Sequence, residues 1–190
     1  MIKCLYPPFQ HWAEKGSVQI ISDPHFDDFD CKFMNPNWIT PEQHIEIINS
    51  CVHKNDTLIC LGDVGNVKRF DAIKCKNRVL VTGNHDKGKT IYEPYFNEVY
   101  DGCVFISDKI LLSHEPIWGL EEFCVNIHGH CHAETEINWR WGHVNLAADV
   151  ANYLPYNLGQ AIKNGLLKDT INYHRITIDL ATEKKEGVIK

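Results

Sequence analysis

Short apolar runs of strand-forming residues recur in the first half of the chain, and a Gly or Asp closely follows each run. These runs cover residues 17–22, 57–61 and 78–82. Between the first two, residues 41–53 carry apolar side chains at helical spacing, with Thr40 as the expected N-cap and Pro41 at the first helical position. A shorter helix is expected over 67–74. Alternating strands and helices predict an α/β arrangement.

The second half of the chain is richer in strands. Two runs, 103–107 and 109–113, predict a hairpin that turns at Asp108. Further strands are expected over 123–127 and 144–148, a helix over 158–166 and a late strand over 171–179. Because strands now follow one another without intervening helices, we expect mixed sheets.

The length of the chain suits one domain. Its 190 residues are enough for one domain with a sizeable core and few for two domains. No repeat or linker divides it, so we predict one domain over 1–190, with 1–16 as an N-terminal extension and a core over about 17–180. The extension has either of two roles, packing over a sheet or contacting a partner.

Charge and composition exclude several classes of protein. The chain has 19 basic and 25 acidic residues, a net charge of −6, which argues against an extended nucleic-acid surface. No apolar stretch is long enough to span a membrane, and the N-terminus lacks a signal-peptide pattern, so we expect a cytoplasmic protein. The eight cysteines form no C-x-x-C pair and are interpreted as reduced, buried residues.

Polar residues with metal-binding chemistry follow five of the apolar runs. They are Asp23-x-His25, Gly62-Asp63, Gly83-Asn84-His85-Asp86, Ser113-His114 and Gly129-His130-x-His132. Ligands of open α/β sheets collect beyond the carboxyl ends of strands, so separate segments can meet at one edge. Carboxylate, imidazole and amide oxygen suit borderline and hard divalent cations. Asp-x-His alone is common by chance, whereas Gly-Asn-His-Asp is rare. All five motifs in this order, each after a strand, are strong evidence for a metal site.

This order of motifs resembles that of the calcineurin-like metallophosphoesterases. The likeness runs from Asp23 to His132 and, in strand layout, to about Pro155. It implies an α/β fold, a calcineurin-like sandwich of two mixed β-sheets flanked by helices. It also implies two divalent metal ions. Asp63 would bridge them, and the other ligands would be Asp23, His25 and His132 on the first and Asn84, His114 and His130 on the second.

The resemblance also implies a mechanism. Manganese is the expected ion, with Fe, Zn, Ni and Mg as alternatives, and a metal-bridging hydroxide would attack phosphorus. His85 would be the catalytic histidine and general acid, oriented by Asp86. His128, which precedes the motif glycine, would either support the ligands from behind or face the substrate.

One departure narrows the substrate. Protein phosphatases of the family continue the second motif as G-D-x-x-D-R-G, whereas this chain reads Gly62-Asp63-Val64-Gly65-Asn66. The chain is similar to small stand-alone bacterial or phage phosphoesterases, which favours a phosphodiesterase acting on a small nucleotide-like substrate. Phosphomonoesterase, short-oligonucleotide nuclease and a catalytically silent scaffold remain as alternatives, and the oligomeric state stays open.

The remaining polar and aromatic residues receive ordinary structural interpretations. His44 and His53, on the predicted helix, are expected to face solvent. Asp27, Asp28 and Asp30 are expected to be exposed, because carboxylates near a cationic site would repel an anionic substrate. Trp38, Trp118, Trp139 and Trp141 either cap the core or stack on a nucleobase, and we favour the core.

Overall fold

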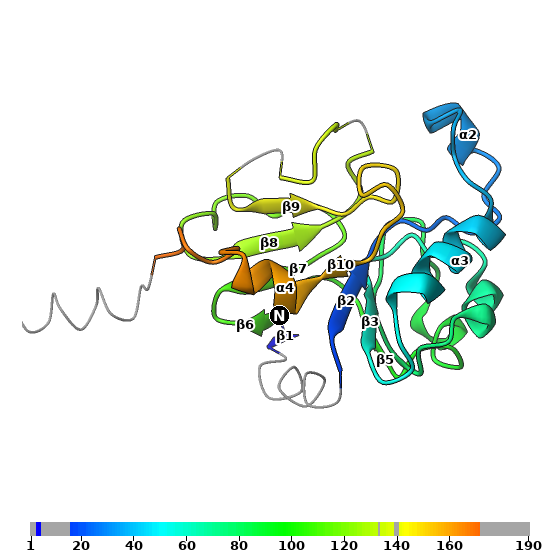
Figure 1. The fold of residues 1–190 in the computed structure, drawn as a ribbon, viewed down its shortest axis with the longest axis horizontal. Helices are drawn as coiled ribbons and strands as arrows, with labels where there is room; N and C mark the ends of the chain where they lie inside the picture. The colour runs from blue at the N-terminus through cyan, green and yellow to red at the C-terminus, as the bar shows by residue number, and fades with distance from the viewer. Residues whose placement is uncertain (1–2, 5–15, 133, 139–140, 172–190) are drawn as a thin grey trace, which may run out of the picture.

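Two five-stranded β-sheets form the frame of the molecule (Figure 1). The computed structural model describes residues 3–4, 16–132, 134–138 and 141–171. The strand order is β10-β2-β3-β4-β5 in the first sheet and β1-β6-β7-β8-β9 in the second. The strands are β1 (Lys3–Cys4), β2 (Val18–Ile21), β3 (Thr57–Cys60), β4 (Asn77–Val81), β5 (Glu98–Tyr100), β6 (Val104–Ser107), β7 (Ile110–Leu112), β8 (Val125–His128), β9 (His143–Asn145) and β10 (Tyr156–Asn157).

Both sheets are mixed, as the resemblance implied. In the first sheet β2 to β5 are parallel, and β10 pairs with β2 in the opposite direction. In the second, β6 and β7 form the predicted antiparallel hairpin, while the other pairs are parallel. Parallel neighbours end at the same edge, so the loops that follow β2, β3 and β4 lie together.

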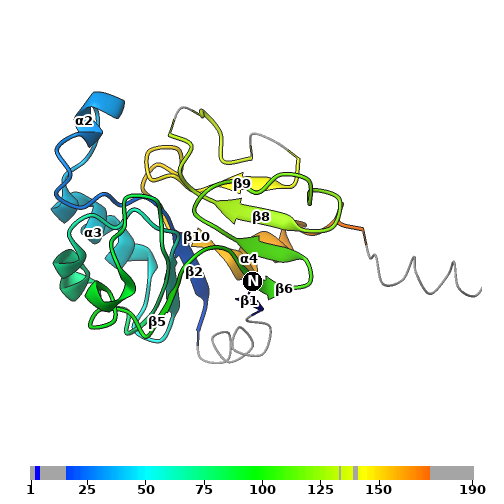
Figure 2. The same ribbon diagram turned by 180° about the vertical axis from the view of Figure 1, so that it is seen from behind.

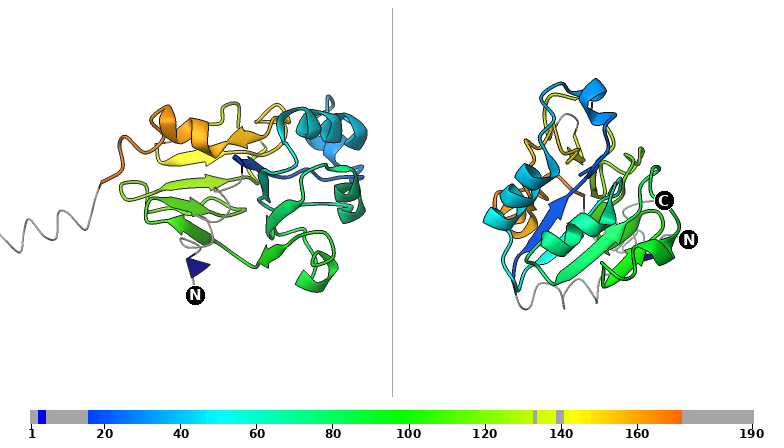
Figure 3. Two further views of the ribbon diagram at one scale, coloured as in Figure 1. Left: turned by 60° about the horizontal axis from the view of Figure 1, so that its bottom comes forward. Right: turned by 90° about the vertical axis from the view of Figure 1, so that its right-hand side faces the viewer.

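The main core fills the space between the two sheets. Alternate residues of the first sheet, such as Ile20 and Ile59, meet Ile106 and Ile127 of the second, and all four are fully buried. A second core lies on the outer face of the first sheet, where helices cover it (Figures 2 and 3). The first sheet is therefore buried on both faces, which explains why 57–61 is continuously apolar instead of alternating.

Five helical segments accompany the sheets. They are α2 (Cys31–Met34), α3 (Pro41–Cys51), the 3₁₀ helices η1 (Val67–Ala72) and η2 (Lys89–Ile91), and α4 (Leu158–Lys163), all within the described ranges. The predicted start of α3 is confirmed by a capping box. The Thr40 hydroxyl accepts from the Gln43 N–H at 3.3 Å, and the Gln43 side chain accepts from the Thr40 N–H at 2.9 Å.

The remaining predicted elements are mostly confirmed within a few residues. The segment expected as a helix over 67–74 is the 3₁₀ helix η1. Strands β5 and β10 and helix α2 were not predicted, because they are only two to four residues long. The strand expected over 171–179 lies outside the described residues beyond Ile171. None of the described helices is long and apolar enough to cross a membrane.

Some burial predictions are wrong. His44 is buried, because it packs between the rings of Phe26 and Tyr153 at 5.6 and 5.3 Å. Trp118 and Trp141 are half exposed instead of capping the core, and Trp139 lies outside the described residues. His53 is exposed, as predicted. The cysteines whose side chains the structure describes form no disulfides, but Cys51, Cys103 and Cys131 are only partly buried, unlike the prediction.

Candidate metal centre

The predicted ligands meet where strands of both sheets end. Asp23 and His25 follow β2, Asp63 follows β3, and Asn84 follows β4. The second sheet contributes His114 after β7 and the pair His130 and His132 after β8. Backbone hydrogen bonds join the first two loops, since the amides of Asp23 and His25 donate to the carbonyls of Gly62 and Asp63 at 3.1 and 3.0 Å. The sequence predicted this convergence correctly.

The backbone of this region adopts an unusual conformation. Asp23, His25, Asp63 and His130 all have positive φ values, between 42° and 67°. L-residues rarely adopt this region, and such strain tends to collect at functional sites. Close packing accompanies the strain: a Cβ atom on Gly129 would lie 2.0 Å from Asp23 Oδ2. The motif glycine is therefore required for this approach.

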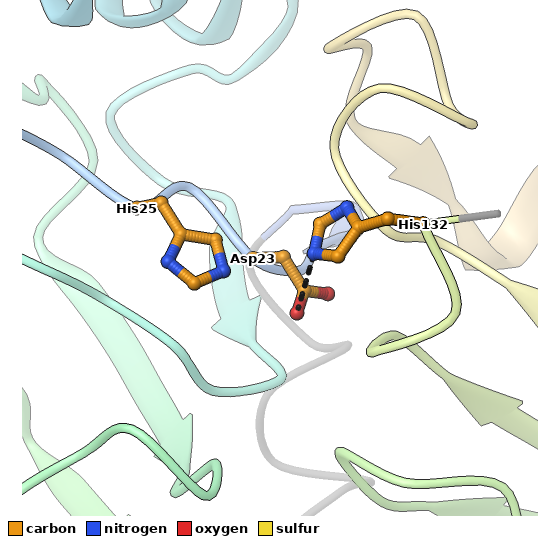
Figure 4. Close-up of side chains that lie close together, drawn as sticks. All are labelled: Asp23, His25 and His132. Atoms are coloured by element: carbon orange, nitrogen blue, oxygen red, sulfur yellow. Dashed lines mark ion pairs between the residues drawn. The ribbon is translucent and has the colours of Figure 1, made fainter. Parts of the chain in front are cut away.

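One group of ligand atoms comes from Asp23, His25 and His132 (Figure 4). One atom from each lies within 4.8 Å of the others, and the two imidazole rings flank the carboxylate. Asp23 is fully buried, and its Oδ1 has no hydrogen-bond partner among the described residues. His132 Nε2 lies 3.6 Å from this oxygen. A buried carboxylate oxygen without a donor is costly, and a divalent cation is a suitable partner for it.

Burial raises the pKa of Asp23, although the nearby His114 and His132 oppose this shift. A bound cation would favour the ionised form, which is the form that acts as a ligand.

A second group consists of Asp63, His114 and His130, with Asn84 beside them. His114 Nδ1 lies 2.8 Å from the Leu61 carbonyl oxygen and so donates to it. Its Nε2 faces three ligand-type atoms: Asn84 Oδ1 at 2.7 Å, His130 Nδ1 at 3.2 Å and Asp63 Oδ2 at 3.3 Å. This convergence fits a cation bound by all four side chains.

The carboxylates around His114 shift its pKa. Burial lowers the pKa of His114, but the hydrogen bond to Asp63 and the charges of Asp23 and Asp63 outweigh it and raise this pKa to about 9. The same contacts with His114 hold the pKa of Asp63 below its ordinary value, against the opposing effect of burial. Positive charge is therefore favoured at this position.

Asp63 connects the two groups. Its Oδ2 lies 3.6 Å from His25 Nε2 and 3.3 Å from His114 Nε2. Its other oxygen, Oδ1, accepts the backbone N–H of His85 at 2.9 Å. One carboxylate thus faces both sets of ligand atoms, which is the arrangement a bridging ligand needs.

His85 is exposed at this edge, and its ring packs against that of His25 at a centroid distance of 5.7 Å.

The expected orientation of His85 by Asp86 is not seen. Instead, the Asp86 carboxylate accepts the backbone N–H groups of Asp63, Val64 and Gly83 at 2.8–3.0 Å. It also accepts the Tyr92 hydroxyl at 3.0 Å. Its described partners do not include the His85 ring, so Asp86 fixes the ligand loops.

The structure decides between the two alternatives for His128 and corrects the expected exposure of Asp27 and Asp28. His128 is fully buried, so it cannot face a substrate. It lies behind the ligands, with Nδ1 2.8 Å from the Gly129 carbonyl, and burial lowers its pKa to about 4. Of the three nearby acids only Asp30 is exposed: Asp27 pairs with Arg69, and Asp28 lies 3.3 Å from His25 Nδ1.

Two residues beside the centre were not among the predicted site residues. Asp149 Oδ1 lies 2.7 Å from His132 Nδ1. Trp38, interpreted as a core residue, is partly exposed and contacts the rings of His25 and His132 at 6.0 and 5.6 Å. Asp149 comes 17 positions after His132, and Trp38 lies outside all the motifs.

The sequence model of calcineurin-like phosphoesterases matches residues 17–169. The chain belongs to the calcineurin-like phosphoesterase family. Family membership implies metal-dependent phosphoester hydrolysis, and the two ligand groups agree with it. A search of curated proteins finds no match to the chain.

Two solved structures are similar to this phosphoesterase chain. One is a protein of unknown function from Aquifex aeolicus, with 27% identity and a TM-score of 0.64, matched over 77% of this chain and 98% of that one. The other is a single mutant of Vps29 from Entamoeba histolytica, with 18% identity and a TM-score of 0.43, over 70% and 75% of the respective chains.

Proposed function

We propose that this protein is a two-cation phosphodiesterase that hydrolyses a small nucleotide-like ester. The observation that carries the proposal is the position of Asp63, whose Oδ2 faces His25 Nε2 at 3.6 Å and His114 Nε2 at 3.3 Å. A carboxylate shared by two ligand groups favours a pair of cations over one.

The proposed ligands follow these groups. Asp23, His25 and His132 would hold the first ion, and Asn84, His114 and His130 the second, with Asp63 on both. Oxygen and imidazole donors fit manganese, and they also fit iron or zinc. When bound, the ions supply electrostatic stabilisation of the phosphoryl oxygens and a water of lowered pKa.

His85 is proposed to protonate the oxygen of the leaving group. Its side chain is exposed at the edge where the ligands gather, so an ester can reach it. Its backbone N–H is held by Asp63, which ties its position to the centre. A general acid must lie within hydrogen-bond reach of the oxygen that it protonates, and the contact of the His85 ring with His25, one of the proposed ligands, supports this role.

The surroundings favour a diester over a monoester. The second Asp and the Arg of G-D-x-x-D-R-G are replaced by Asn66 and Val67. Val67 is buried, and the Asn66 side chain donates to Asp27. Arg69 is engaged by Asp27 and Glu42. A monoester carries up to two negative charges near neutral pH and a diester carries one, so the diester needs less additional positive charge.

A substrate panel with Mn²⁺ tests this function. Bis(p-nitrophenyl) phosphate, p-nitrophenyl phosphate, cyclic nucleotides, dinucleotides and short oligonucleotides are compared at equal concentration. We expect the chromogenic diester to be hydrolysed faster than the monoester. Preference for the monoester would support a phosphatase instead. Two bound ions with no hydrolysis of any ester would support the scaffold.

The same assay assigns the residues. His85→Ala and Asp63→Ala should each lower kcat/KM by roughly a hundredfold or more, because the first removes a proton donor and the second a shared ligand. His53→Ala is the matched control, since His53 is exposed and its ring lies beside Asp56, which is not a proposed ligand. Full activity in both variants would overturn the assignment.

A further inference from the structure

Asp149 contacts the centre from outside the family motifs. It lies in the turn between β9 and β10, 17 positions after His132. Its Oδ1 is 2.7 Å from His132 Nδ1, and Asp149 and His132 are both largely buried, with side-chain exposures of 9% and 15%. At this distance the imidazole Nδ1–H donates to the carboxylate.

Several hydrogen bonds fix this turn against the loop that carries His132. The side-chain amide of Asn145 donates to the Cys131 carbonyl at 2.8 Å, and the backbone N–H of Leu146 donates to the His128 carbonyl at 2.6 Å. The Tyr153 N–H closes the turn by donating to the Ala148 carbonyl at 2.7 Å. Asp149 is therefore held in place by the ends of β8 and β9.

The contact determines which ring nitrogen of His132 is available. With the proton on Nδ1, Nε2 carries the lone pair, and it is Nε2 that lies 3.6 Å from the unsatisfied Asp23 Oδ1. Trp38 packs on the same ring from another segment, at 5.6 Å. The ring is thus restrained by two residues that were not part of the predicted set.

We infer that Asp149 is a positioning residue, which holds His132 with Nε2 directed at the first cation. The inference rests on the proposed function for the presence of that cation. Residues that hold a ligand histidine by its other nitrogen typically contribute 10–100-fold to metal affinity.

The other histidines provide an internal comparison. His25 Nδ1 lies 3.3 Å from Asp28 Oδ2, a longer contact, and the other oxygen of Asp28 accepts the Asp30 N–H at 3.0 Å. His114 is held by the neutral Leu61 carbonyl instead. Asp28 is therefore expected to contribute less than Asp149.

Titration of the ion-free protein with Mn²⁺ in a calorimeter tests the inference. Asp149→Ala should weaken one of two binding events by about 10–100-fold, and Asp149→Asn by less, because its amide oxygen can still accept the Nδ1–H. Asp28→Ala should have a smaller effect than Asp149→Ala. Asp27→Ala is the matched control. It removes a carboxylate next to Asp28, but this carboxylate pairs with Arg69 and not with a ligand histidine. Unchanged affinity in Asp149→Ala would overturn the inference.

A spectroscopic measurement on the unaltered protein covers the case in which a variant fails to fold. In the Zn²⁺-loaded protein, long-range ¹H–¹⁵N spectra should show His132 protonated at Nδ1 and metal-bound at Nε2. The opposite arrangement would overturn the role of Asp149 while leaving the two-cation proposal intact. Binding of no metal by the unaltered protein would instead overturn both.

Discussion

At the scale of single residues, the centre combines ligands that their motifs identify with supports that no motif marks. Asp23, Asp63 and His114 were predictable because carboxylates and imidazoles follow strand ends in an order typical of the family. Asp86 was also found, but its contacts were not. Residue type and adjacency suggest that an acid next to a histidine orients it. The backbone turn at Gly83 instead directs Asp86 toward three amide groups.

This difference leads to a prediction about stability. Asp86→Ala should lower the free energy of unfolding by roughly 3 kcal/mol, because it leaves partly buried N–H groups of two ligand loops without an acceptor. Asp86→Asn, which keeps one acceptor oxygen, should lose less. Urea denaturation of the ion-free protein measures both. A large loss of activity with unchanged stability in Asp86→Ala would support the original view that Asp86 acts on His85.

At the scale of elements, the capped helix α3 shows where pattern succeeds and where it stops. Its start was predictable from Thr40, Pro41 and Gln43, since capping depends on residues adjacent in sequence. Its buried face was only partly predictable. Ile45 and Ile48 pack on the first sheet, as helical spacing suggests. His44 is also buried, because its ring lies between those of Phe26 and Tyr153. Those contacts are tertiary, so helical periodicity cannot show them.

The burial of His44 predicts a pH dependence of stability. Burial lowers the pKa of His44 from its ordinary 6.5 to about 4 in the folded protein. Between these values the unfolded chain binds more protons, so the contribution of His44 is fully present above pH 6.5 and is lost as the pH falls towards 4. The loss is on the order of 3 kcal/mol.

His44→Phe, which keeps an aromatic ring, provides the comparison. The difference in unfolding free energy between the two ion-free proteins should be constant above pH 7 and should shift in favour of the variant as the pH falls to 4. Denaturation curves across this range measure it. A difference that does not change with pH would mean that His44 exchanges protons freely in the folded state.

At the scale of the whole molecule, the apolar runs predicted a mixed α/β arrangement and the edge where the ligands gather. The division into two mixed sheets was implied by the resemblance to the family. Short edge strands such as β5 and β10 escaped prediction, because two or three residues give no periodicity. The partial exposure of Trp118 and Trp141 also escaped it, since loop residues carry no repeating pattern to indicate which side faces the core. The fold brings five segments to one edge, and this arrangement supports the proposed chemistry.

The proposed function requires that two cations share Asp63. A crystal structure of the Mn²⁺-loaded protein, with anomalous scattering at the manganese edge, tests this requirement. Two anomalous peaks should lie roughly 3.5–4 Å apart, one beside Asp23, His25 and His132 and the other beside Asn84, His114 and His130, with Asp63 touching both. One peak alone, or two peaks that do not both contact Asp63, would contradict it.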